Sequence, residues 1–129
     1  MRHLLIAASV TFSLAPALFT GSALAQSPGL EQACVAVAKT FLLTPVLKTG
    51  VVQSFPELTP PGARLTYSTR ENPEATDFQD TIECEFKQSQ APFGLTRFCI
   101  SNTCYAPNED DPERQRRFAE VKALMDRQK

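Results

Sequence analysis

The sequence has no tryptophan and only one histidine, His3, close to the N-terminus. Histidine supplies the general base of Ser-His and Cys-His catalytic pairs, the axial ligand of many haem proteins and a frequent ligand of zinc. If the first residues are removed, the rest of the chain contains no imidazole, and these kinds of site are excluded. We predict no metal ion, no cofactor and no catalytic residues, with hydrolysis by carboxylates, which needs no histidine, as the exception.

Charge is also scarce at the N-terminus, where Arg2 is the only charged side chain among residues 1–25. An apolar run over residues 4–19 follows, and an Ala-Leu-Ala sequence ending at Ala25 offers the small side chains that signal peptidase accepts. We predict a signal peptide that is cleaved after Ala25. A retained membrane anchor is the alternative, but Pro16 interrupts the run, which is short for a span of about 20 residues.

The predicted mature chain, residues 26–129, has the length of one small domain. Without Arg2 it carries 12 basic and 14 acidic side chains, a formal charge of −2. Nucleic acid and anionic lipid require clustered basic residues, which are here interspersed with acids. We expect neither a nucleic-acid partner nor a membrane anchor. A lipid anchor is not expected because no small apolar lipobox precedes the first cysteine, Cys34.

Apolar periodicity predicts a helix near each end of the mature chain and four strands between them. A capping residue followed by proline begins each helix, at Ser27-Pro28 and at Asp111-Pro112. The predicted helices cover residues 30–43 and 112–127, and the predicted strands cover residues 63–68, 82–86, 97–100 and 103–106. Residues 46–62 are rich in Pro and Gly and are expected to form an irregular connector with at most one short element, around residues 51–55.

This order of elements predicts an α+β fold with an N-terminal helix, a four-stranded antiparallel meander and a C-terminal helix. One face of the predicted sheet is apolar, and each helix has one apolar stripe to bury. We therefore expect both helices to pack on the same sheet face.

The four cysteines predict two disulfides, because an even number in a small exported chain is typical of an oxidising compartment. A turn at Ser101-Asn102 would place Cys99 directly opposite Cys104 on neighbouring strands. Cys84 would then lie on the apolar sheet face, within reach of Cys34 on the first helix. The rival pairing, Cys34–Cys104 with Cys84–Cys99, would require a bulge in the third strand.

A redox enzyme and a hydrolase are the two catalytic alternatives. Thiol oxidoreductases mostly use two cysteines separated by two residues at a helix start, whereas Cys99 and Cys104 lie in a hairpin. Glu83 and Glu85 could act as a pair of acids, but such a pair needs an enclosed cleft. An ion pair between Glu85 and Arg97 across the sheet would explain both of these residues without catalysis.

Three aromatic residues are not explained by the periodicity of the predicted core. Phe55, Phe78 and Phe93 lie in proline-rich or polar segments, where no pattern predicts their burial. Exposed aromatic side chains in loops are frequent anchors for a protein partner. These three are therefore the candidate partner-contact residues, with packing against the sheet edge as the alternative.

Three segments of the chain resemble small exported periplasmic proteins of alphaproteobacteria that have no assigned function. These segments are Ile82–Phe86, Arg97–Tyr105 and Arg116–Val121. The resemblance covers most of the mature chain in outline. It implies a periplasmic location and nothing about catalytic residues.

Together these observations favour a non-catalytic interaction or accessory module of the periplasm, or a secreted one. The alternative is a small inhibitor of a periplasmic or host hydrolase, which would insert the loop Gln90–Gly94 into an active site. A deep pocket lined by two acids would instead favour an enzyme, whereas a rigid projecting loop without a pocket would favour the inhibitor.

Overall fold

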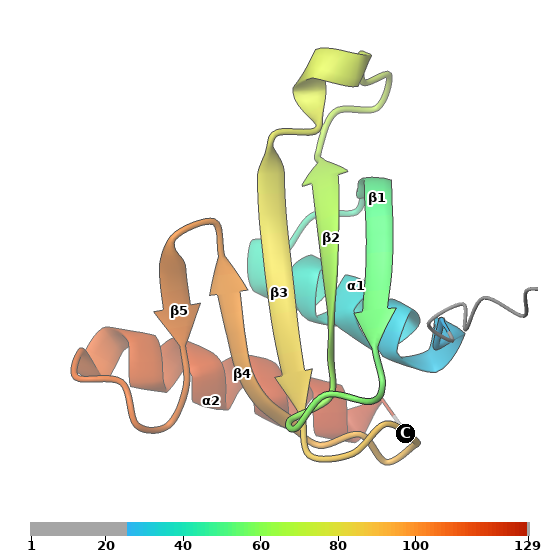
Figure 1. Ribbon diagram of the computed structural model, residues 1–129. Coiled ribbons are helices and arrows are strands. Elements are labelled where there is room, and N and C mark those ends of the chain that lie inside the picture. The colour runs from blue at the N-terminus through green and yellow to red at the C-terminus, as the bar shows by residue number, and fades with distance from the viewer. Residues whose placement is uncertain (1–25, 129) are drawn as a thin grey trace, which may run out of the picture.

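The structure is a computed structural model, in which residues 26–128 are described. The predicted signal peptide lies outside these residues. The elements are helix α1 (Pro28–Leu42), strands β1 (Lys48–Phe55) and β2 (Gly62–Ser68), the 3₁₀ helix η1 (Ala75–Asp77), strands β3 (Asp80–Phe86), β4 (Leu95–Ile100) and β5 (Thr103–Tyr105), and helix α2 (Pro112–Arg127) (Figure 1).

The five strands form one antiparallel sheet in the order β1-β2-β3-β4-β5. Both helices lie on the same side of this sheet, with α1 behind β1, β2 and β3 and α2 behind β4 and β5 (Figure 1). The predicted α+β fold and the placement of both helices on one face are confirmed. The prediction of four strands is wrong, because there are five.

The additional strand is β1, which occupies much of the predicted irregular connector, residues 46–62. The register of β1 against β2 shifts between Thr49 and Val52, so the alternation of faces is interrupted inside the strand. Its first four residues, Lys48–Val51, are all exposed. An edge strand with a bulge and an exposed first half has no period-two apolar pattern, which is why periodicity did not predict it in full.

The free edge of β1 is closed near its end by the chain that leads into α1. The hydroxyl of Ser54 accepts a hydrogen bond from the amide of Ser27 at 2.6 Å and donates one to Glu31 at 3.0 Å. The amide of Ser54 donates to Oε1 of Gln26 at 3.2 Å. These bonds fix the start of α1 against the edge of the sheet.

Local capping sets the start of both helices, as the sequence predicted. The side chain of Ser27 accepts a hydrogen bond from the amide of Leu30, and Asp111 accepts one from the amide of Glu113. Each cap satisfies an amide that has no partner within its helix. The capping positions therefore determine where the apolar stripe of each helix begins.

The core lies between the helices and the sheet, and aromatic rings fill its α2 side. The ring of Phe98 is fully buried and packs edge-on against Phe41, whose centroid lies 5.3 Å away. Arg117 of α2 lies over the ring of Phe41 at 4.5 Å and donates a hydrogen bond to its carbonyl oxygen. A cation–π contact of this kind stabilises by about 0.5–2 kcal/mol, and here it joins α2 to α1.

Tyr67 of β2 belongs to the same core, with 3 % of its surface exposed. Burial raises the pKa of the Tyr67 hydroxyl, and the negative charge of Asp80, its neighbour on β3, adds to the effect. Both causes disfavour the ionised form, so the fold holds this tyrosine neutral.

The two disulfides are Cys34–Cys84 and Cys99–Cys104, so the rival pairing is wrong. Cys34–Cys84 ties α1 to β3 inside the core, where its two residues are 0 % and 2 % exposed. Cys99 lies opposite Cys104 in the β4–β5 register, as the turn at Ser101-Asn102 predicted. Because alternate residues point to opposite sides of a strand, this second disulfide lies on the sheet face that the helices leave open.

Candidate functional site

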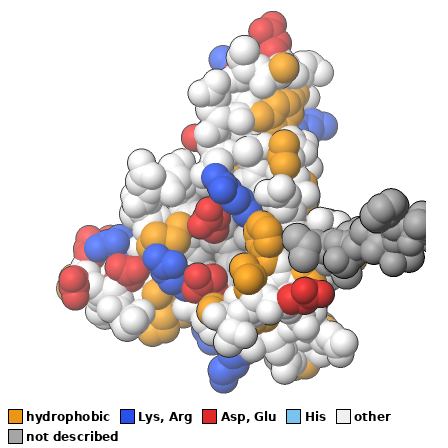
Figure 2. Space-filling view, viewed as in Figure 1, with side chains coloured by type: hydrophobic (Ala, Val, Ile, Leu, Met, Phe, Trp, Pro, Cys, Tyr) orange, Lys and Arg blue, Asp and Glu red, His pale blue; other side chains and the backbone are white. Residues whose placement is uncertain are grey.

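The candidate site is the sheet face opposite the helices, which we call the open face. Side chains that alternate with the core positions point to it (Figure 2). Its residues in the middle of the sheet are Gln53, Gly62, Arg64, Thr66, Glu83, Glu85, Arg97 and Cys99. Charged side chains gather near its centre, with apolar side chains beside them (Figure 2).

The open face contains a hollow of about 250 Å³. Gly62 lines it and pairs with Phe55 of β1 on one side and with Glu85 of β3 on the other. A Cβ atom at this position would collide with the carbonyl oxygen of Cys84. Close approach of β2 and β3 beneath the hollow therefore requires glycine here.

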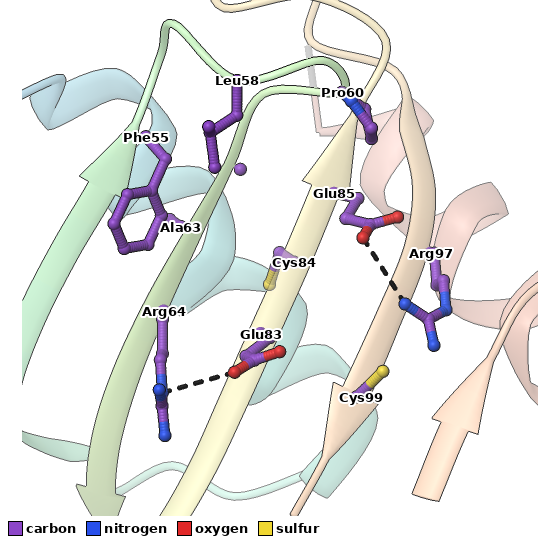
Figure 3. Close-up of a pocket in the computed structure, with 11 residues that line it drawn as sticks. Phe55, Leu58, Pro60, Ala63, Arg64, Glu83, Cys84, Glu85, Arg97 and Cys99 are labelled. Carbon is purple, nitrogen blue, oxygen red and sulfur yellow. Dashed lines mark hydrogen bonds and ion pairs between the residues drawn. The ribbon is translucent and has the colours of Figure 1, made fainter.

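Apolar side chains form one wall of the hollow, and charged side chains form the other (Figure 3). Phe55, which is half-buried, and Leu58 and Pro60 from the β1–β2 connection form the apolar wall. Leu58 has 59 % of its surface exposed, a large fraction for leucine. This wall therefore presents uncovered apolar surface beside a depression.

The charged wall consists of two ion pairs that cross the sheet. Arg64 of β2 lies 3.3 Å from Glu83 of β3, and Arg97 of β4 lies 3.4 Å from Glu85 of β3 (Figure 3). The predicted pairing of Glu85 with Arg97 is confirmed. All four side chains are between 38 % and 54 % exposed. Exposed pairs stabilise a fold by only about 0–1 kcal/mol, so they can open at low cost when another charged group arrives.

Arg97 also connects the charged wall to the disulfide on the open face. One terminal nitrogen of its guanidinium contacts Glu85, and the other donates to the Sγ atom of Cys104 at 3.1 Å. Cys99, the other half of the disulfide, lines the hollow. The sulfur of Cys104 therefore contacts a positively charged group, whereas Cys99 lies at the wall of the hollow.

The three candidate partner-contact residues lie in three different places. Phe55 lines the hollow. Phe78 lies at the other end of β1, where a side chain at Gly50 would meet its ring at 3.2 Å. Phe93 packs on Phe86 of the core, with the ring centroids 5.8 Å apart, and lies against Gly29 of α1. The structure thus does not bring the three together in one surface.

Sequence reasoning missed the other parts of the hollow, Leu58, Pro60 and Gly62. The available signal was the density of Pro and Gly over residues 56–62, which indicated a turn but not what it covers. In the sheet register Gly62 lies between Phe55 and Glu85. This position could not be predicted without knowing that β1 pairs with β2.

The loop Gln90–Gly94 is held by its own hydrogen bonds. The amide of Lys87 donates to the carbonyl oxygen of Gly94 at 2.8 Å, and that of Gln88 donates to Phe93 at 3.2 Å. The side-chain amide of Gln88 donates to the carbonyl oxygen of Pro92 at 2.6 Å. This loop lies at the same end of the sheet as the β1–β2 connection (Figure 1).

Among residues 26–128, no group of three or more His, Cys, Asp or Glu side chains is arranged to hold a metal ion. Within the same range, no helix has the length and apolar character needed to cross a membrane. Comparisons with protein-family models, with curated proteins and with solved structures give no match. The function of this chain must therefore be inferred from its own sequence and geometry.

Proposed function

We propose that this protein is an exported, non-catalytic interaction module that binds a protein partner through the hollow of the open face. The observation that carries the proposal is the hollow itself, where exposed Leu58 and half-buried Phe55 adjoin two exposed ion pairs. Anchoring residues at protein interfaces are typically large apolar or aromatic groups and arginine, surrounded by polar groups that exclude water.

The size of the hollow favours a protein side chain as its occupant. Sites for small molecules and cofactors usually measure about 300–1,000 Å³, and they bury most of the ligand. The hollow is smaller, at about 250 Å³, and it opens onto the sheet surface. An inserted apolar side chain would contact Phe55 and Leu58, while polar groups beside it would meet the ion pairs.

The disulfides support export to the periplasm or the cell exterior, since such bonds persist in oxidising compartments. The predicted signal peptide at residues 1–25 and the resemblance to exported periplasmic proteins agree with this location.

Affinity capture from periplasmic extract tests the proposal, using residues 26–129 as bait. Leu58→Asp places a charge on the apolar wall and should remove the captured protein. Leu43→Asp is the matched control, because Leu43 is 81 % exposed and ends α1 in a left-handed conformation that aspartate tolerates. Retention of the same protein by Leu58→Asp would show that the hollow is not the binding site.

An inhibitor of a hydrolase is the second candidate function. It is favoured by the internal hydrogen bonds of the loop Gln90–Gly94 and by the anchoring of Phe93, because a preorganised loop loses little entropy on binding. In the same capture experiment, an inhibitor would lose its target with Gln90→Ala and keep it with Leu58→Asp.

A further inference from the structure

The disulfide Cys99–Cys104 is less deeply buried than Cys34–Cys84. Cys34 and Cys84 are 0 % and 2 % exposed and belong to the core, although Cys84 also borders the hollow, whereas Cys99 is 7 % exposed at the wall of the hollow and Cys104 is half-buried. We propose that the hollow is a site of thiol–disulfide exchange, in which a low-molecular-weight thiol attacks Sγ of Cys99 and Cys104 leaves as a thiolate stabilised by Arg97.

The direction of attack follows from the order of the strands. A thiolate attacks a disulfide sulfur in line with the S–S bond, from the side opposite the leaving sulfur. Cys104 lies on β5, so the approach to Cys99 comes over β3, which is the side of the hollow. A hollow of about 250 Å³ admits a small thiol compound at this position.

The charges on the open face make Cys104 the better leaving group. The guanidinium of Arg97 lies 3.1 Å from its Sγ atom, and a nearby arginine stabilises a thiolate. Arg114 of α2 donates a hydrogen bond to the carbonyl oxygen of Cys104 but pairs with Glu109 and Asp111, so Arg97 is the cation that contacts the sulfur. Cys99 lies directly across from Glu83, whose negative charge opposes a thiolate there.

The exchange is balanced with two thiols. The first thiolate forms a bond to Sγ of Cys99 and breaks the S–S bond, whose electron pair remains on Cys104. A second thiolate then attacks the sulfur of the first thiol compound and releases Cys99, which takes up a proton. The protein disulfide is reduced to two thiols, and the two small thiols are oxidised to one disulfide.

The first test identifies the sulfur that is attacked. Folded protein is treated with 2-mercaptoethanol, quenched with iodoacetamide at short times and mapped by mass spectrometry of its peptides. We expect the earliest product to carry mercaptoethanol on Cys99 and the alkyl group on Cys104, with Cys34–Cys84 intact. Mercaptoethanol on Cys104, or opening of Cys34–Cys84 at the same rate, would overturn the proposal.

The second test concerns Arg97. A leaving thiol of higher pKa leaves more slowly, so Arg97→Gln should slow reduction, by about threefold. Arg97→Lys should restore most of the rate. Arg64→Gln is the matched control, because it also leaves a carboxylate of β3 unpaired on the open face but lies away from Cys104. Equal rates for Arg97→Gln and Arg64→Gln would refute the role of Arg97.

This inference does not depend on the proposed protein partner. Circular dichroism of each variant before reduction shows whether the fold is intact, so a change in rate is measured only on folded protein. If Leu58→Asp loses the captured partner but is reduced at an unchanged rate, exchange at Cys99 is independent of partner binding. If Arg97→Gln is reduced more slowly but still captures the partner, partner binding is independent of the exchange.

Discussion

Replacing the two disulfides separately should show that they stabilise the fold unequally. Cys34 and Cys84 are 50 residues apart in the sequence, whereas Cys99 and Cys104 are only 5 apart. A bond that closes a longer loop removes more entropy from the unfolded chain. The chain-entropy relation gives about 4 kcal/mol for the first bond and about 2 kcal/mol for the second at 25 °C.

Burial increases this difference. The residues of the Cys34–Cys84 bond are 0 % and 2 % exposed, so replacing both with alanine removes two sulfur atoms from a packed interior. Such substitutions leave a void that the surroundings fill only in part. The Cys99–Cys104 bond lies on the open face, where Cys99 is 7 % exposed and Cys104 is half-buried, so its replacement removes less from the packed interior. The difference between the two double variants should therefore be at least about 2 kcal/mol.

Urea denaturation of Cys34→Ala/Cys84→Ala and Cys99→Ala/Cys104→Ala, without reductant, measures this difference. For a slope of about 1.5 kcal/mol per molar urea, the midpoint should fall at least about 1.3 M further in the first double variant. The slopes of the two curves serve as a control, because a changed slope indicates a different unfolded or native state. An equal or larger loss in the Cys99→Ala/Cys104→Ala protein would refute the reasoning from loop length and burial.

Three further predictions follow from the packing. Gly62→Ala should lower the free energy of unfolding by about 1–3 kcal/mol, measured by denaturation, because its Cβ must displace the backbone of β3. In a Tyr105→Phe protein, Tyr67 is the remaining tyrosine, and an absorbance titration should give a midpoint above about 10, its ordinary value. Stability should be complete below a pH of about 10, where the unfolded tyrosine begins to ionise, and should fall as the pH rises from there through the folded midpoint; a midpoint at or below 10 would contradict its burial. Arg117→Met should lower the thermal midpoint more than substitution of an exposed arginine, and an equal loss would show that the cation–π contact contributes little.

Features that depend on neighbours in the sequence were predictable. Ser27-Pro28 and Asp111-Pro112 define helix starts by the chemistry of the cap itself, and the helices begin there. The turn at Ser101-Asn102 fixed the local register, and that register gave the correct cysteine pairing. In each case a few adjacent residues contain all of the information.

Features that depend on the register of distant strands were not predictable. Strand β1 has a bulge and an exposed first half, so its sequence does not alternate. The hollow needs Phe55, Gly62 and Glu85 in adjacent positions on three strands, and no segment of the sequence contains that arrangement. The position of Phe93 on Phe86 likewise depends on how its loop folds back.

The two edge strands of the sheet affect how the protein behaves at high concentration. An uncovered edge strand offers unpaired amides and carbonyls to another copy of the chain, which is a common route to aggregation. Here β5 has only three residues, and β1 is bulged, begins with Lys48 and is blocked near its end by bonds between Ser54 and the chain before α1. A second molecule therefore finds no long straight edge on which to extend the sheet, so the molecule can keep its open face uncovered without polymerising through its edges.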